Sequence, residues 1–252
     1  MNTPVRAENG KFDIENCTPR ETRSIKRALE QSQMAVHKAL ADIPNGRYSH
    51  YGLWALFKSN ENFSKVRQML QDLIVLKPMP NVYRNLVKQA SSPVIVCISK
   101  DHELQHIRYW WETCHTHKAT TAFYALTSAG ILLCPHFFRL PVAPEPEKSA
   151  ILCPIVRKNR YVGSSRELYA FQSYTLLHEL IHFYLGDENL ASKPGHETYE
   201  PNALVALSAP DVWRNPRAYE YYITCMTHPI RFRGWFRRLT IPLCRSCAAW
   251  LP

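Results

Sequence analysis

Residues 169–185 read YAFQSYTLLHELIHFYL and are followed by Gly186. Apolar side chains would cover most of the perimeter of this stretch as a helix, which predicts a buried helix ending at the glycine. Within it, His178-Glu179-Leu180-Ile181-His182 has the spacing HExxH. Histidines at i and i+4 of a helix project from one face and can bind the same zinc ion, with the glutamate beside a water molecule. The stretch therefore predicts a zinc-binding helix, and two hydrogen-bonded core histidines are the alternative.

The same spacing occurs a second time, in His102-Glu103-Leu104-Gln105-His106. A helix could begin there, with Asp101 or Ser99 as its cap, but this copy joins two segments that we predict to be strands, and its flanks are short and mixed. His115 and His117 lie nearby and could supply a third ligand. A zinc site needs rigid support behind its ligands, which a connection of this kind does not offer. We predict an exposed, histidine-rich connection here and assign the chemistry to His178–His182.

A catalytic zinc ion has three protein ligands, and its fourth position is left to water. The extended pattern HExxHxxGxxH would supply the third ligand, but this chain has Leu185 and Glu188 at the decisive positions. Spacing alone does not choose among the downstream candidates. These are Asp187, Glu188, His196, Glu197, Glu200 and Glu220.

The composition is that of a folded, enzyme-sized protein. The 252 residues are enough for one sizeable domain, and 46% hydrophobic and 12% aromatic residues can fill a core. The net charge of +10 would favour acidic partners, but charge alone does not decide the function. Apolar runs stay shorter than the about 18 residues that a membrane span requires, so we expect no transmembrane segment.

Cysteine usage and the chain ends bear on the cellular compartment. Eight cysteines, an even number, indicate disulfides and an oxidising compartment, with buried free thiols as the alternative. Residues 1–16 are polar and show no apolar region of a signal peptide, which conflicts with that interpretation and would place the protein in the cytoplasm.

Residues 229–252 form a basic extension. Its arginines and aromatic residues could contact an anionic membrane or nucleic acid, an interpretation that we rank last.

Helical and strand patterns divide the chain into two parts. Thr18-Pro19-Arg20-Glu21 resembles a helix start, and helical spacing continues to near Pro44. We predict further helices at 51–58, 62–76, 169–185, 201–207 and 216–226, and strands at 94–98, 120–126, 131–133 and 151–156. The expected class is α+β. One domain would cover residues 17–228, with a helical part at 17–80 and a zinc-binding part with a small β-sheet at 93–228.

Three segments, taken together, resemble the fungal deuterolysin and peptidyl-Lys metalloendopeptidase family, the aspzincins. They are Cys134-Pro135-His136-Phe137-Phe138, Thr175–His182 and Asn215–Tyr222. In that family a Cys-Pro strand precedes the zinc helix, a Gly-Thr-x-Asp-x-x-Tyr-Gly segment follows it, and a further helix closes the domain. The resemblance implies a zincin-like fold and a secreted zinc metalloendopeptidase that acts on a protein or peptide substrate. We expect a monomer and no nucleic-acid partner.

The third ligand is where this chain departs from the family pattern. Gly195-His196-Glu197-Thr198-Tyr199-Glu200 stands in the place of the Gly-Thr-x-Asp-x-x-Tyr-Gly segment. When the two are aligned on Tyr199, the ligand position falls on His196. The resemblance therefore implies one zinc ion bound by His178, His182 and His196. The alternatives at the third position are Glu197 and Asp187.

The resemblance also implies roles for two further residues. Glu179 would be the general base, taking a proton from water and delivering it to the leaving amine. Tyr199 would donate a hydrogen bond to the oxyanion of the reaction. The implied disulfides are Cys97–Cys114, Cys134–Cys153 and Cys17–Cys225. The competing hypothesis is a non-catalytic, secreted interaction or effector protein with the same fold, because the third-ligand segment is divergent.

Overall fold

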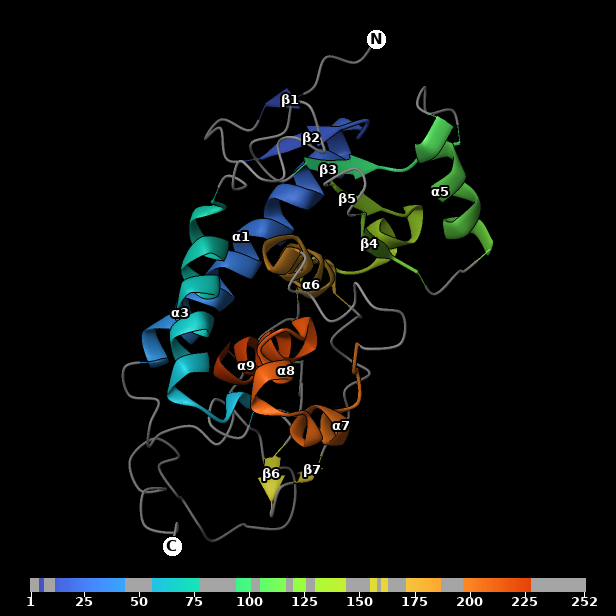
Figure 1. Ribbon diagram of the computed structural model, residues 1–252. Helices are drawn as coiled ribbons and strands as arrows, with labels where there is room; N and C mark the ends of the chain where they lie inside the picture. Colours follow the sequence, from blue (N-terminus) through green and yellow to red (C-terminus); the bar gives the residue numbers. More distant parts are fainter. Residues whose placement is uncertain are drawn as a thin grey trace, which may run out of the picture. The chain divides into compact units, whose positions relative to one another are not determined.

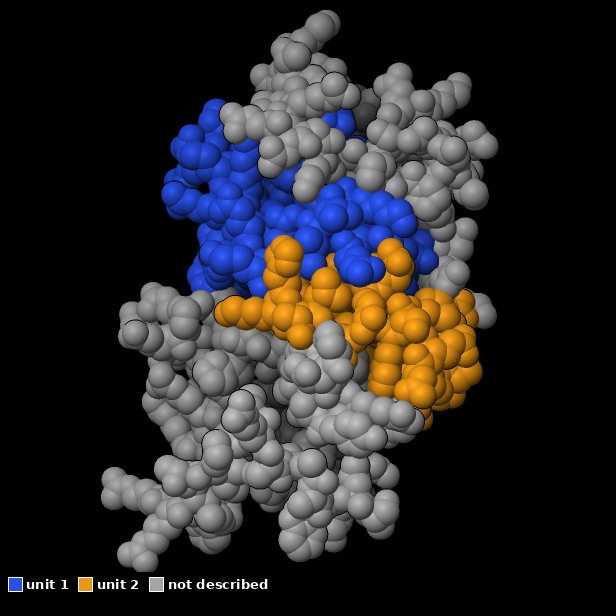
Figure 2. Space-filling model, turned by 90° about the vertical axis from the view of Figure 1, so that its left-hand side faces the viewer, with its two compact units in different colours: residues 1–34, 71–144, 166–189 blue, residues 35–70, 145–165, 190–252 orange. Residues whose placement is uncertain are grey.

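The chain forms two compact units, which Figure 2 colours blue and orange. Unit 1 comprises residues 1–34, 71–144 and 166–189, and unit 2 comprises residues 35–70, 145–165 and 190–252. The computed structural model describes residues 5–6, 12–43, 56–77, 94–100, 105–116, 120–125, 130–143, 155–157, 160–162, 171–186 and 197–227. The predicted domain boundaries at residues 16 and 228 stay predictions.

A mixed five-stranded sheet belongs to unit 1 (Figure 1). Its strand order is β1 (Val5–Arg6), β2 (Asp13–Glu15), β3 (Val94–Cys97), β5 (Gly130–Leu133) and β4 (Ala122–Ala125). The three inner strands pair in parallel, and the two outer strands pair antiparallel to their neighbours. Every residue of β5 is buried, as is typical of a strand covered on both faces. The predicted α+β class, with a small β-sheet, is confirmed.

Strand β2 lies in the segment for which the sequence predicted only polar chain. Its residues pair in parallel with Val94–Val96, and Ile14 is buried. A strand of three residues with a single apolar side chain has no pattern that distinguishes it from a polar loop. Its place is determined by the backbone hydrogen bonds of a partner strand about eighty residues along the chain, as counted from the register.

Two disulfides join elements of this sheet and its covering helix. Cys17 is bonded to Cys97, with 5.1 Å between their Cα atoms, and Cys114 is bonded to Cys134, with 5.5 Å. The sheet register explains the first bond, because Glu15 lies opposite Val96 and Cys17 follows just beyond the end of β2. All three pairings that the family resemblance implied are therefore wrong. Cys97–Cys114, Cys134–Cys153 and Cys17–Cys225 each contain a cysteine that is bonded elsewhere.

Helix α5 (Gln105–Thr116) occupies most of the segment predicted to be an exposed connection. Its Cys114 is buried in a cluster with residues of β3 and β5, and Trp110 and Trp111 pack against that cluster. Trp110, Trp111 and Cys114 therefore do not belong to an exposed connection, contrary to the prediction. The signal was present in the sequence, because Trp110 and Trp111 precede Cys114 by four and three residues and so lie on the same side of a helix as the cysteine.

Helix α1 (Pro19–Asp42) begins where the sequence predicted. The Glu21 N–H donates to Thr18 Oγ1 at 3.2 Å, and the Thr18 N–H donates to Glu21 Oε2 at 2.8 Å, which is a capping box. Helix α3 (Asn60–Val75) also matches its prediction. The Gln33 Nε2 donates to the Ile74 carbonyl at 2.7 Å, which joins the two helices in unit 1. No helix in the described part of the chain is long and apolar enough to cross a membrane.

Helix α6 (Gln172–Leu185) contacts strands β4 and β5 (Figure 1). Its first turn is held by neighbouring segments, since the Gln172 and Ser173 N–H groups donate to the Pro141 and Val142 carbonyls, each at 2.9 Å. Ser32 Oγ donates to the Ser173 carbonyl at 2.7 Å. The bonds from the Gln172 and Ser173 N–H groups satisfy backbone donors that the start of a helix otherwise leaves without partners. The helix therefore has rigid support on more than one side.

Unit 2 contains a hairpin of β6 (Ile155–Arg157) and β7 (Arg160–Val162), and the helices α7 (Pro201–Ala206), α8 (Ala209–Val212) and α9 (Pro216–Thr227). The Phe57 ring packs on the rings of Tyr219 and Tyr222 of α9. Asn62 Nδ2 donates to the Ala209 carbonyl at 2.7 Å, which ties α3 to the start of α8. Lys58 Nζ donates to the Val205 carbonyl at 2.5 Å, at the end of α7.

The Cys134–Phe138 motif does not form the strand that the resemblance implied. Strand β5 ends at Leu133, and residues Pro135–Arg139 form a short 3₁₀ helix (η3) with Phe137 buried. Proline at the first position of this helix suits a helical turn, because its fixed φ is compatible and its nitrogen has no hydrogen to donate. The cysteine still lies in the core, where it forms the disulfide to α5.

Candidate metal centre

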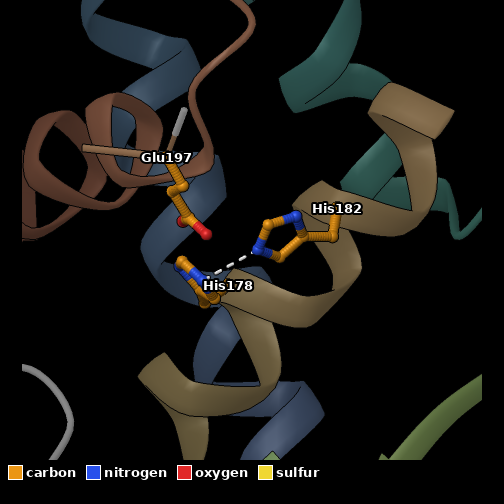
Figure 3. A group of neighbouring side chains, drawn as sticks. All are labelled: His178, His182 and Glu197. Atoms are coloured by element: carbon orange, nitrogen blue, oxygen red, sulfur yellow. Dashed lines mark hydrogen bonds between the residues drawn. The ribbon is translucent and has the colours of Figure 1, made fainter. Parts of the chain in front are cut away.

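His178 and His182 project from the same face of α6, one turn apart (Figure 3). Their Nε2 atoms are 2.9 Å apart, and the side chains are only 4% and 7% exposed. Two ligand atoms of one tetrahedral zinc ion, at about 2.0 to 2.1 Å from the metal, lie about 3.3 Å apart. The distance between the two imidazole nitrogens is close to this value. A hydrogen bond between two neutral imidazoles would give a similar distance. The alternative of two hydrogen-bonded core histidines therefore has the same geometry.

Glu179 lies between the two histidines in the sequence and is also buried, at 7% exposure. The remainder of α6 is largely apolar. Leu176, Leu177, Leu180 and Ile181 are buried around these polar side chains. Burying imidazoles and a carboxylate together costs free energy that metal binding or hydrogen bonds must offset. The concentration of polar groups on one face of an otherwise apolar helix therefore indicates a functional site.

Glu197 completes a group of potential metal ligands with the two histidines. One ligand atom from each of His178, His182 and Glu197 lies within 4.8 Å of the others. Figure 3 shows the Glu197 carboxylate directed toward the two imidazole rings. Two imidazole nitrogens and one carboxylate oxygen are a donor set that catalytic zinc sites use, with the fourth position open. The residues therefore fit zinc by the chemistry of their donor atoms.

The other third-ligand candidates have different positions. His196, to which the resemblance assigned the ligand position, lies outside the described residues, as do Asp187 and Glu188. Glu200 is exposed. Glu220 is fully buried in α9, where its Oε2 forms an ion pair with Arg217 at 2.5 Å. Glu197 was one of the alternatives in the sequence, but nothing in its local pattern distinguished it from its acidic neighbours.

Tyr199 lies next to the metal group through its contact with Glu197. The Tyr199 hydroxyl donates to Glu197 Oε2 at 2.6 Å, and the Tyr199 side chain is 46% exposed. The Tyr221 hydroxyl, on α9, reaches the Tyr199 carbonyl at 3.5 Å. Sequence reasoning had assigned Tyr199 to the oxyanion of the reaction and did not predict its contact with Glu197.

The first HExxH copy falls mostly outside the part of the chain that the structure describes. His102, Glu103 and Leu104 precede the first residue of α5, and His117 follows its last. His115 is exposed, and its ring stacks on Trp111 with 6.3 Å between centroids. The assignment of chemistry to the second copy stays a prediction.

The chain is similar to a solved structure, and it matches no family model and no curated protein. The structure is similar to that of a zinc peptidase from Grifola frondosa, with 16% sequence identity and a TM-score of 0.47. The likeness covers 82% of this chain and 96% of that chain. A likeness of this degree carries no argument about chemistry, which depends on the side chains of the site.

Proposed function

We propose that this protein is a zinc-dependent metalloendopeptidase. The observation that carries the proposal is the pair of buried imidazoles of His178 and His182, with 2.9 Å between their Nε2 atoms and Glu179 beside them. All three residues belong to α6 and to unit 1. A helix held at its first turn and packed on a sheet can keep these groups in place, as a catalytic constellation requires.

Glu197 is the third ligand in this proposal, in place of the His196 that the family resemblance implied. Its carboxylate is grouped with the two imidazoles. A set of two histidines and one glutamate is as suitable for zinc as three histidines. Separate substitutions decide between the residues, because Glu197→Ala would lower zinc affinity strongly whereas His196→Ala would leave it near the wild-type value.

The proposed reaction is hydrolysis of a peptide bond. When bound, zinc lowers the pKa of a water molecule and polarises the carbonyl that is attacked. Glu179 accepts the proton of that water at a carboxylate oxygen and delivers it to the nitrogen of the leaving amine. Its buried position on α6 limits exchange of this proton with bulk water. The disulfides Cys17–Cys97 and Cys114–Cys134 support a place outside the cytosol.

The test separates zinc binding from proton transfer. Glu179→Gln should retain one zinc ion per chain and lose casein hydrolysis by at least about 100-fold, because it removes the group that moves the proton. Glu103→Gln is the matched control in the other HExxH copy and should retain both zinc and activity. Equal losses of activity in the two variants would contradict the assignment to α6.

The metal content of the wild-type chain separates the remaining alternatives. One zinc ion with hydrolysis of casein or of a peptide library supports the proposal. One zinc ion without turnover of any peptide supports the non-catalytic interaction protein. A wild-type chain that binds no zinc would leave His178 and His182 as hydrogen-bonded core histidines, and the proposal would fail.

A further inference from the structure

We propose that Tyr199 is a positioning residue, which holds the Glu197 carboxylate in the orientation for metal binding. This inference rests on the proposed function, since it concerns the same site. It departs from the role as donor to the oxyanion that the family resemblance implied. The contact that carries it is the hydrogen bond from the Tyr199 hydroxyl to Glu197 Oε2, at 2.6 Å.

The length of this bond is that of a charge-assisted hydrogen bond. O–H groups that donate to an ionised carboxylate lie about 2.5 to 2.7 Å from it and are bound more strongly than neutral pairs. The hydroxyl has one proton to donate, and it is directed to Oε2. The other carboxylate oxygen, Oε1, is shielded from solvent. The hydrogen bond thus orients the carboxylate through Oε2, as outer hydrogen-bond partners commonly do for metal-binding carboxylates.

Helix α9 supports the backbone at Tyr199. The residues from 197 to 199 form neither helix nor strand, so the conformation of this segment depends on individual contacts. The Tyr221 hydroxyl reaches the Tyr199 carbonyl at 3.5 Å, and the Tyr221 side chain is buried. The Arg217 guanidinium lies 4.9 Å from the centre of the Tyr221 ring. Tyr199 therefore links the buried side chains of α9 to the Glu197 carboxylate within unit 2.

The variant Tyr199→Phe tests this inference by metal binding as well as by activity. We expect zinc affinity, measured by competition with a chelator, to fall about 10- to 100-fold, because the carboxylate loses its orienting partner. The visible absorption spectrum of the cobalt-substituted chain should also change, because it reports the ligand geometry. Phenylalanine should be tolerated at this position, since the side chain is 46% exposed.

Tyr219→Phe is the matched control. It removes a tyrosine hydroxyl from the same unit, one that donates to the Trp213 carbonyl at 2.7 Å and is not part of the metal group. A merely structural loss of a hydroxyl should leave zinc affinity and the cobalt spectrum unchanged. A fall in zinc affinity in Tyr219→Phe equal to that in Tyr199→Phe would overturn the positioning role.

A double-mutant cycle tests whether Tyr199 acts through Glu197. If Tyr199 acts through Glu197, Tyr199→Phe should weaken zinc binding in the wild-type background and have no further effect in the Glu197→Gln background. Equal effects in both backgrounds would overturn the inference. So would a fall in kcat with wild-type zinc affinity and an unchanged cobalt spectrum, which is the result expected of an oxyanion donor.

The outcomes for the wild-type chain separate the two proposals. A wild-type chain that binds zinc without hydrolysing peptides contradicts the peptidase, while the affinity measurements still decide the role of Tyr199. If the wild-type chain hydrolyses casein and Tyr199→Phe binds zinc normally, the peptidase stands and the positioning role fails. Both proposals fail if the wild-type chain binds no zinc.

Discussion

His178 and His182 face one another across one turn of α6, with 2.9 Å between their Nε2 atoms. The geometry of the α-helix brings residues four apart onto one face, and the packing of α6 on β4 and β5 keeps that face fixed. A metal ion that binds both rings would replace the contact between the two nitrogens. The pair is therefore the part of the site most directly open to experiment.

Substitution of either histidine should abolish stable zinc binding. His178→Ala and His182→Ala each remove one of the proposed ligands, and we expect dialysed protein to lose its bound zinc in both cases. His115→Ala is the control, because His115 is exposed, stacks on Trp111 and is not part of the metal group. Elemental analysis measures the zinc content. Retention of one zinc ion by both α6 variants would contradict the assignment.

Removal of zinc should lower the melting temperature of the wild-type chain. A ligand that binds the folded state alone stabilises it, so adding a chelator should shift the transition to lower temperature. His178→Ala should show no such shift, because it has no bound zinc to lose. Differential scanning calorimetry with and without chelator makes this comparison, and an equal shift in both proteins would point to another metal site.

The two disulfides should differ in their contribution to stability. The Cys17–Cys97 bond closes a loop of 80 residues, and the Cys114–Cys134 bond a loop of 20. Loop entropy in the unfolded chain predicts about 4.5 kcal/mol for the longer loop and about 3.3 kcal/mol for the shorter one. Denaturant unfolding of Cys17→Ser/Cys97→Ser and Cys114→Ser/Cys134→Ser measures both. A larger loss in the second variant would contradict the expectation.

Glu15→Gln should stabilise the protein at neutral pH. Burial, and secondly the charge of Asp13, raise the pKa of Glu15 above its usual value of 4.5. The folded state therefore binds the Glu15 proton more tightly than the unfolded state does. Protonated Glu15 contributes to the free energy of unfolding. This contribution is fully present below the usual pKa and is lost as the pH rises through the raised pKa of the folded state.

The difference in stability between Glu15→Gln and wild type should change with pH in one direction. The unfolding midpoint of Glu15→Gln in urea should exceed that of wild type above the raised pKa, and the difference should become smaller toward acid pH. Glu21→Gln is unsuitable as a control, because Glu21 caps α1. Exposed Glu30 serves instead, and Glu30→Gln controls for the loss of one negative charge from the protein. A difference that grows toward acid pH would contradict the prediction.

Replacing only one partner of the ion pair between Arg217 and Glu220 should destabilise the protein. Both side chains are buried, at 1% and 0% exposure, and are joined at 2.5 Å. Arg217→Met or Glu220→Gln alone removes the opposite charge from a buried ionised group and should cost about 3 to 5 kcal/mol. The double replacement Arg217→Met with Glu220→Leu should cost less than either single change, because no charge remains.

An exposed ion pair provides the control for this measurement. Lys65 and Glu61 are joined at 2.9 Å, but their side chains are 37% and 78% exposed. Glu61→Gln should therefore change the free energy of unfolding by less than about 1 kcal/mol. Equal effects of Glu61→Gln and Glu220→Gln in denaturant unfolding would show that burial does not govern the α9 pair.

Several elements could be predicted because their signals are local. The capping box of Thr18 and Glu21, the apolar run of α6 and the short apolar strands β3 and β5 each lie within one segment. The strand β2 and the disulfide partners could not be predicted in this way. Strand β2 and the Cys17–Cys97 bond depend on a sheet register that brings together residues about eighty apart. The Cys114–Cys134 bond depends on the packing of α5 against the sheet, and the family resemblance supplied the wrong cysteine pairs.

The sequence by itself determined the helix that presents His178 and His182, since spacing and an apolar perimeter are properties of a single segment. It left the third ligand open among several nearby carboxylates and His196. Only the tertiary structure grouped Glu197 with the two imidazoles and joined Tyr199 to its carboxylate. The reason is physical: a helix determines the positions of its own residues, whereas a ligand from an irregular segment is positioned by contacts with other parts of the chain.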